Sequence, residues 1–176
     1  MRYLPVAHTG NQSSSPEEAE VVRRLVKDFL ASNPTWINRE GLESPLTLDD
    51  ILIIALYNAQ VFELQSRLAD ARIGTVDKFQ GQEAPVVIYS MTTSSHADAP
   101  RGMEFIYSLN RLNVATSRAQ YLCVLVASSK VFEAECRTPE QMRLANAYCR
   151  YLELAQQPTL RNLGDSPIPG AFKDAA

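Results

Sequence analysis

The residues that most often build metal and redox sites are scarce in this sequence of 176 residues. It contains three cysteines and two histidines. Cys123, Cys136 and Cys149 form no C-x-x-C pair, and His8 and His96 lie far apart along the chain. This pattern argues against a zinc site and a disulfide framework, and it is typical of reduced thiols. The sequence therefore predicts no metal site and a cytoplasmic protein.

Long apolar runs and the common catalytic loops are also missing. No segment reaches the roughly 20 apolar residues of a membrane-spanning helix, and no signal peptide is recognisable. The sequence has no G-x-x-x-x-G-K-S/T phosphate loop, no G-x-G-x-x-G turn and no G-x-S-x-G nucleophile elbow. A complete catalytic set of a common kind is therefore absent, which disfavours a stand-alone α/β hydrolase.

Positive charge is not in excess either. Lysine and arginine total 17 against 20 aspartates and glutamates, which gives a net charge of −3. A dedicated nucleic-acid module is usually basic, so the net charge argues mildly against one. A local basic stripe remains compatible with this balance.

The apolar pattern is that of a globular α/β domain, with hydrophobic residues at 45%. The sequence contains short continuous apolar runs, such as 51–56, and such runs are typical of strands that are buried on both faces. Strands are predicted over 1–8, 51–56, 72–76, 84–91 and 121–128. Helices are predicted over 15–32, 59–68, 107–120 and 139–154. This alternation indicates a mostly parallel β-sheet with helices on both faces.

Polar segments rich in proline and glycine are expected to form loops over 33–47 and 92–105. The tail 157–176 has the same composition, so the domain is expected to cover 1–156. The first strand starts without a polar lead-in, and we expect the chain to be cut from a longer one. Trp36 is expected to lie as a hydrophobic lid on the sheet.

One connection between predicted strands, "TVDKFQGQE" (75–83), is unusually polar. Tyr57, Asp77 and Thr92 each follow a predicted strand, and ligands gather at the carboxyl ends of parallel strands. We therefore expect this connection to lie at that edge of the sheet. Its residues alone allow a solvated turn around Gly81. They equally allow a ligand to approach Gly81 while Glu83 accepts hydrogen bonds from hydroxyl groups.

A second segment, "LNRLNVATSRAQ", carries two arginines seven residues apart, Arg111 and Arg118. On a helix they share a face. Guanidinium groups bind phosphate oxygens with paired hydrogen bonds, so the pair suits an anionic ligand. Surface ion pairs with carboxylates are the alternative.

Together these segments resemble two motifs of superfamily 1 helicases. "TVDKFQGQEAPVVIYSM" is similar to motif V, with its V-D-x-F-Q-G-x-E run, and "RLNVATSRAQ" is similar to motif VI. "IALYNAQVFEL" resembles the Pro-Tyr-x-x-Gln segment, although Leu56 stands where proline is usual. Order and spacing match from His8 to Ser128, and the DNA2/NAM7-like branch is the most similar. The stretch 92–105 also resembles a bacterial subgroup in which a RecB-like nuclease domain precedes the helicase.

The resemblance implies a RecA-like P-loop NTPase fold and the second of two such domains, with ATP and Mg²⁺ bound between them. The phosphate loop and the Mg²⁺ ligands would lie on the first domain. Arg118 would be the arginine finger that reaches the γ-phosphate. The nucleotide-binding residues would be Gly81, Gln82, Glu83 and Arg111.

The resemblance further implies contact with single-stranded DNA or RNA. The residues that contact the strand or couple it to the nucleotide would be Tyr57, Asn58, Gln60, Thr75, Asp77, Lys78 and Gln80. An internal ion pair is expected between Arg111 and Asp77. The family's Q-Y-R-M-H-P segment should precede residue 1, so the isolated chain is expected to bind nucleotide weakly and not to hydrolyse it. The alternative is a RecA-like scaffold or nucleic-acid-binding module without ATPase activity.

Overall fold

The computed structural model describes residues 1–38, 40–79, 81–133 and 135–155. The predicted tail 157–176 and Gln80 lie outside the described residues. Among the residues that are described, no helix is long and apolar enough to cross a membrane.

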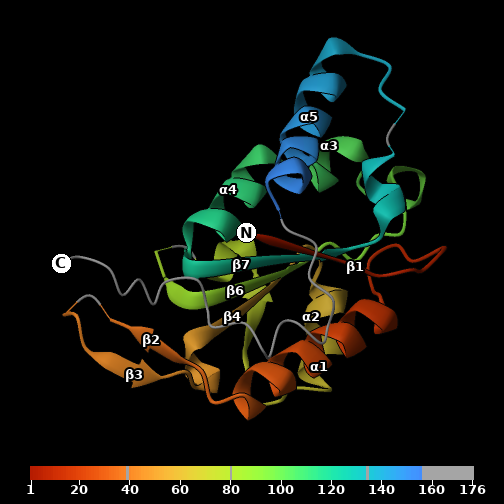
Figure 1. Ribbon diagram of the computed structural model, residues 1–176. Coiled ribbons are helices and arrows are strands. Elements are labelled where there is room, and N and C mark those ends of the chain that lie inside the picture. Colours follow the sequence, from red (N-terminus) through yellow and green to blue (C-terminus); the bar gives the residue numbers. More distant parts are fainter. Residues whose placement is uncertain (39, 80, 134, 156–176) are drawn as a thin grey trace.

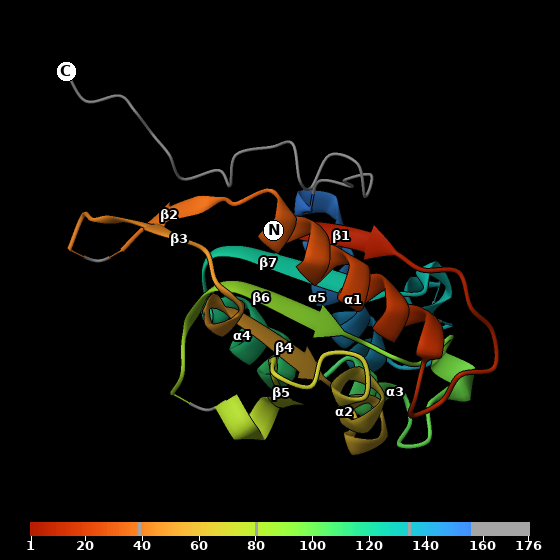
Figure 2. The same ribbon diagram turned by 90° about the horizontal axis from the view of Figure 1, so that it is seen from below.

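The fold is built on a five-stranded sheet in the order β1-β7-β6-β4-β5, and every neighbouring pair is parallel. Figure 2 shows the strands running side by side with their carboxyl ends toward α2 and α3. The strands are β1 (Arg2–Pro5), β4 (Ile51–Ala55), β5 (Arg72–Thr75), β6 (Ala84–Ser90) and β7 (Ala119–Ala127). All five predicted strands are confirmed, with ends that differ by up to three residues.

Helices cover both faces of this sheet (Figure 1). Helices α1 (Pro16–Ala31) and α2 (Asn58–Gln65) lie on one face. Helices α3 (Met103–Ile106), α4 (Leu109–Ser117) and α5 (Pro139–Leu154) lie on the other. The predicted parallel α/β architecture, a RecA-like arrangement, is therefore confirmed.

The core consists of two layers, one on each face of the sheet. Successive side chains in a strand point to opposite faces, so Ile51 and Ile53 pack toward α1 and α2, while Leu52 and Ile54 pack toward the other helices. Every residue of β4 and β6 is buried. This double coverage explains the continuous apolar runs in the sequence.

Helix α1 begins where the sequence predicts. The Ser15 hydroxyl accepts a hydrogen bond from the Glu18 amide at 3.1 Å, and Pro16 occupies the first turn. Helix α2 starts one residue earlier than predicted and ends at Gln65 instead of Leu68. The chain continues in a turn beyond Gln65, because the Leu68 amide donates to the Leu64 carbonyl at 2.9 Å.

Two predicted loops contain regular structure, and one of them, 92–105, includes the 3-10 turn His96–Asp98 and the start of α3. The segment after α1 forms an antiparallel hairpin of β2 (Thr35–Ile37) and β3 (Glu43–Pro45). Figure 2 shows this hairpin beside the amino ends of β6 and β7. Trp36 packs against Tyr121 of β7, with 6.0 Å between ring centroids. Trp36 thus packs against the core layer of α1, as predicted, but from a strand rather than a loop.

Candidate functional site

The polar connection 75–83 crosses the sheet from one edge to the other. Thr75 ends β5 at the carboxyl edge, Val76–Phe79 form a 3-10 turn (η2), and Glu83 immediately precedes β6. A connection between parallel strands must return the chain to the start of the next strand. The prediction that the whole segment lies at the carboxyl edge is therefore wrong for Gly81, Gln82 and Glu83, which lie at the amino edge.

The amino edge brings Glu83 close to Arg118. Ala84 and Ala119 are paired across β6 and β7, and the Ala84 amide donates to the carbonyl of Arg118 at 3.0 Å. The Glu83 carboxylate accepts a hydrogen bond from the side-chain Nε2 of Gln120 at 3.2 Å. Two of the predicted nucleotide-binding elements, far apart in sequence, are thus neighbours.

A cavity of about 510 Å³ opens beside them and is called the amino-edge cavity; it is lined by Trp36, Asn38, Glu40, Gly81, Glu83 and Gln120. Gly81 has φ +81°, and a Cβ atom there would meet no atom within 4 Å. A glycine is therefore needed at position 81 because the backbone is left-handed there, and not because another atom of the chain packs against it. Gln82 is engaged locally, because it accepts from Arg72 at 3.0 Å and donates to the Lys78 carbonyl at 3.3 Å.

Arg118 caps the carboxyl end of α4 and is half-buried. Its Nε is buried without a hydrogen-bond partner, and no ion pair of Arg118 occurs within the described ranges. A guanidinium group in this state has donors available for an anion. Arg118 lines a cavity of about 330 Å³ together with Asp77 and Arg111.

The expected ion pair between Arg111 and Asp77 is not formed in the described part of the chain. Arg111 instead lies over the ring of Phe105, with 4.1 Å between the guanidinium carbon and the ring centroid. The flat, weakly hydrated guanidinium group stacks well on an aromatic face. Asp77 is exposed and lines the same cavity as Arg111 and Arg118.

A third cavity, of about 450 Å³, lies at the carboxyl edge of the sheet. It collects residues that follow four different strands, β1, β4, β5 and β6, together with the start of α4. We call it the carboxyl-edge cavity; its polar and aromatic lining includes Gln12, Ser13, Tyr57, Asn58, Thr75, Asp77, Arg101, Phe105 and Arg111. Four residues predicted to contact or couple a nucleic acid therefore line one space: Tyr57, Asn58, Thr75 and Asp77.

Tyr57 packs within this cavity wall. Its exposed fraction is 8%, and its ring lies 5.2 Å from that of Phe105. Burial raises the pKa of the Tyr57 phenol above its ordinary value. Of the two roles that the sequence leaves open, base stacking and packing, the structure favours packing.

Lys78 is held by its own segment. Its aliphatic chain crosses Gly74, where an added Cβ would lie 2.4 Å from the Lys78 Cδ. Its ammonium group donates to the carbonyl of Ile73 at 2.7 Å. Lys78 therefore fixes the turn after β5, and its charge points back to the strand.

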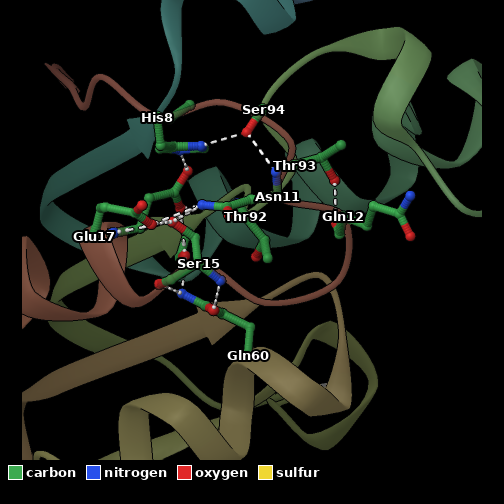
Figure 3. Close-up of polar contacts among 12 residues, drawn as sticks. His8, Asn11, Gln12, Ser15, Glu17, Gln60, Thr92, Thr93 and Ser94 are labelled. Carbon is green, nitrogen blue, oxygen red and sulfur yellow. Dashed lines mark hydrogen bonds and ion pairs between the residues drawn. The ribbon is translucent and has the colours of Figure 1, made fainter.

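Gln60 of α2 is fully buried and belongs to a polar network that joins this helix to the loop before α1 and to the end of β6 (Figure 3). Its side chain accepts from the Ser15 amide at 2.7 Å and donates to the Ser15 carbonyl at 3.2 Å and to the Ser90 hydroxyl at 3.1 Å. It cannot touch a ligand in this arrangement. Gln60 is a positioning residue for the turn that carries Tyr57 and Asn58.

Glu18 is the centre of this network, and the sequence prediction missed it. Its carboxylate accepts from the Ser90 hydroxyl at 2.6 Å and the Thr92 amide at 2.9 Å, and it lies 3.0 Å from His8 Nε2. His8, which follows β1, also contacts the Ser94 hydroxyl at 2.7 Å. Thr92 has φ +73°, a strained conformation for a β-branched residue that the bond to Glu18 supports.

The charged position of Glu18 is visible in the sequence as an anomaly. It falls on the apolar stripe of α1, one residue before Ala19 and four before Val22, and it is fully buried. A carboxylate on the buried side of a helix needs hydrogen-bond partners, and this signal was available without the structure. Among the residues described, no group of three or more metal-binding side chains is suitable for a metal ion.

Comparison with known proteins adds family information. The model of the AAA domain family matches residues 6–130. The chain is 37% identical over 95 residues to DNA polymerase alpha-associated DNA helicase A of Schizosaccharomyces pombe, covering 51% of the chain and 14% of that protein. It is 33% identical over 146 residues to the putative regulator of nonsense transcripts 1 of Takifugu rubripes, covering 77% and 13%.

A third relative extends the match over nearly the whole chain. The DNA replication ATP-dependent helicase/nuclease JHS1 of Arabidopsis thaliana is 25% identical over 169 residues, or 95% of the chain and 11% of that protein. The chain thus spans between 11% and 14% of the length of these three relatives.

Proposed function

Since this chain belongs to the AAA domain family found in superfamily 1 helicases, we propose that it is the second RecA-like motor domain of an ATP-dependent helicase. The observation that carries the proposal is the juxtaposition of Glu83 and Arg118 at the amino edge of the sheet. A carboxylate suited to ribose hydroxyls and a guanidinium group whose Nε has no partner among the described residues lie directly before two adjacent strands.

In this proposal Arg118 is the arginine finger. ATP is bound with Mg²⁺ by a first RecA-like domain, which supplies the phosphate loop and the metal ligands. The fixed charge of Arg118 stabilises the negative charge that develops on the γ-phosphate during transfer. Its buried Nε, which lacks a partner in the described residues, fits this role because no internal carboxylate has to be displaced.

Glu83 accepts hydrogen bonds from the ribose hydroxyls, and the left-handed turn at Gly81 allows the backbone to approach the nucleotide. Gln82 holds this turn to the η2 segment through the Lys78 carbonyl. Arg111 joins the two sites, because it lines the cavity of Arg118 and the carboxyl-edge cavity.

The single strand of DNA or RNA passes the carboxyl-edge cavity, where Asn58, Thr75 and Asp77 are placed to contact it. Lys78 and Gln60 act through the backbone segments that they hold. Gln80 is assigned to the same coupling segment by the resemblance alone. A RecB-like nuclease domain in the parent chain and a cytoplasmic location complete the proposal.

The test is a comparison of ATP hydrolysis and strand binding in the parent protein. Replacing the arginine finger lowers turnover by roughly 10³–10⁵-fold in related phosphoryl-transfer enzymes. We expect Arg118→Ala to lower kcat on this scale while single-strand affinity stays unchanged. The matched control is Arg150→Ala, which removes an exposed arginine that pairs with Glu153 on α5.

Wild-type turnover in Arg118→Ala would contradict the assignment of the finger. Strand binding without any ATPase activity in the wild-type parent protein would favour the alternative, a RecA-like scaffold or nucleic-acid-binding module.

A further inference from the structure

Two arginines from different elements converge on one aromatic ring in the carboxyl-edge cavity. Arg101 lies in the loop between β6 and α3, and its guanidinium carbon is 4.8 Å from the centroid of the Phe105 ring. Arg111, in the first turn of α4, lies 4.1 Å from the same centroid. Neither arginine has a carboxylate partner within the described ranges. Phe105 therefore orients two unpaired positive charges toward one space.

The charge of this arrangement favours an anion. Like charges that share a site repel each other, and Asp77 is the one carboxylate among the residues that line the cavity. Stacking fixes the plane of each guanidinium group and leaves the N–H donors at its edge available for hydrogen bonds. A phosphate group offers oxygens that match these donors and a charge that offsets the repulsion.

Hydrogen bonds to a neighbouring loop hold the uncharged part of the cavity lining, Gln12 and Ser13, in place. Thr93 donates its hydroxyl hydrogen to the Gln12 carbonyl at 2.8 Å, and the Ser94 amide donates to the Asn11 carbonyl at 2.9 Å. These bonds tie the loop before α1, which carries Gln12 and Ser13, to the loop after β6 (Figure 3). The cavity lining thus combines a preorganised polar part with a cationic, aromatic one.

We propose that Arg101 is a phosphate-contacting residue of the single-strand site, with Phe105 as the positioning residue that holds it beside Arg111. The ligand is the sugar–phosphate backbone of a single strand, which would pass over the Phe105 platform. This inference rests on the proposed function for the presence of a strand, but it assigns residues outside both helicase-like motifs.

The test measures the affinity of the 176-residue chain for fluorescent oligo-dT and oligo-U by anisotropy, without ATP, between about 50 and 200 mM salt. Each phosphate contact to a single strand contributes about 0.7 to the slope of log affinity against log salt. We expect Arg101→Ala to reduce this slope by about 0.7 and to weaken binding by about tenfold at the lowest salt. Arg101→Lys keeps the charge and retains most of the slope.

Two further variants distinguish the contribution of the Phe105 ring from a general effect of positive charge on binding. Phe105→Leu keeps an apolar side chain but removes the ring, and it is expected to weaken binding as Arg101→Ala does. Arg143→Ala removes an exposed arginine of α5 that pairs with Glu140 and is expected to leave affinity and slope unchanged.

A wild-type slope in Arg101→Ala would overturn the inference, and so would a wild-type chain that binds neither oligonucleotide. Displacement of the oligonucleotide by ATP or inorganic phosphate, with the same loss in Arg101→Ala, would also overturn it, because the cavity would then bind a nucleotide phosphate. Since this assay contains no hydrolysis step, its failure is distinguishable from that of the Arg118 assignment.

Discussion

The carboxylate of Glu18 has no exposed side-chain surface, and neither does the imidazole of His8 that it contacts. Its oxygens meet groups from the loops after β1 and β6. A buried carboxylate is tolerated when several donors replace its lost hydration. The residues that line the carboxyl-edge cavity depend on this one side chain, because it ties together the loops that carry them.

Glu18→Gln tests that dependence. The amide keeps the shape of the side chain but turns one acceptor into a donor, which leaves at least one buried donor unsatisfied. We expect a loss of about 1–3 kcal/mol in the free energy of unfolding, measured by urea denaturation. Glu20→Gln, on the exposed side of the same helix, is expected to cost much less. Equal losses in the two variants would contradict the role of Glu18.

At the level of elements, periodicity was sufficient for most of the fold. The apolar runs 51–56 and 84–91 and the stripe of α1 predict buried strands and a covering helix, because burial selects their residues directly. The hairpin of β2 and β3 was not predicted, because its six residues alternate between exposed and half-buried positions and include Pro45. Short, half-exposed strands carry little apolar signal.

The residues of the candidate site could be predicted only where they belong to the two helicase-like motifs. The pairing of Glu83 with Arg118 follows from strand order, which periodicity does not give, and the split of 75–83 between two edges follows from the 3-10 crossover. Arg101 and Phe105 were missed because a lone arginine and a lone phenylalanine in a loop have no pattern. Their role depends on contacts between side chains that only the folded chain brings together.

The interior strand β7, which lies between β1 and β6, gives a prediction about cysteine reactivity. Burial raises the pKa of the Cys123 thiol to about 11, whereas Cys136 and Cys149 are half-buried. The reactive species is the thiolate, so a raised pKa suppresses reaction at neutral pH. We expect iodoacetamide at pH 8 to label Cys149 and Cys136 in the folded chain and to spare Cys123, as read by mass spectrometry.

Labelling of Cys123 should accelerate as the pH approaches 11, because its thiolate fraction then rises. In urea all three cysteines are expected to react alike. Rapid labelling of Cys123 in the folded chain at pH 8 would show that β7 is not a stable interior strand.

For the molecule as a whole, the sheet separates two sites and one helix connects them. Glu83 and Arg118 lie at the amino edge, and the Arg101–Phe105–Arg111 group lies at the carboxyl edge. Helix α4 carries Arg111 in its first turn and Arg118 at its cap. A nucleotide that moves Arg118 therefore acts on a helix that also carries a residue of the proposed strand site, which is the geometry that a motor domain needs.

The most direct measurement is a crystal structure of the parent protein with ADP, aluminium fluoride and a single strand bound. The account predicts that the Arg118 guanidinium group lies at a charge-assisted hydrogen-bond distance, about 2.7–2.9 Å, from the γ-phosphate mimic. It also predicts Glu83 at the ribose. A transition-state mimic bound with Arg118 turned away from it, or held by a carboxylate of its own domain, would contradict the account.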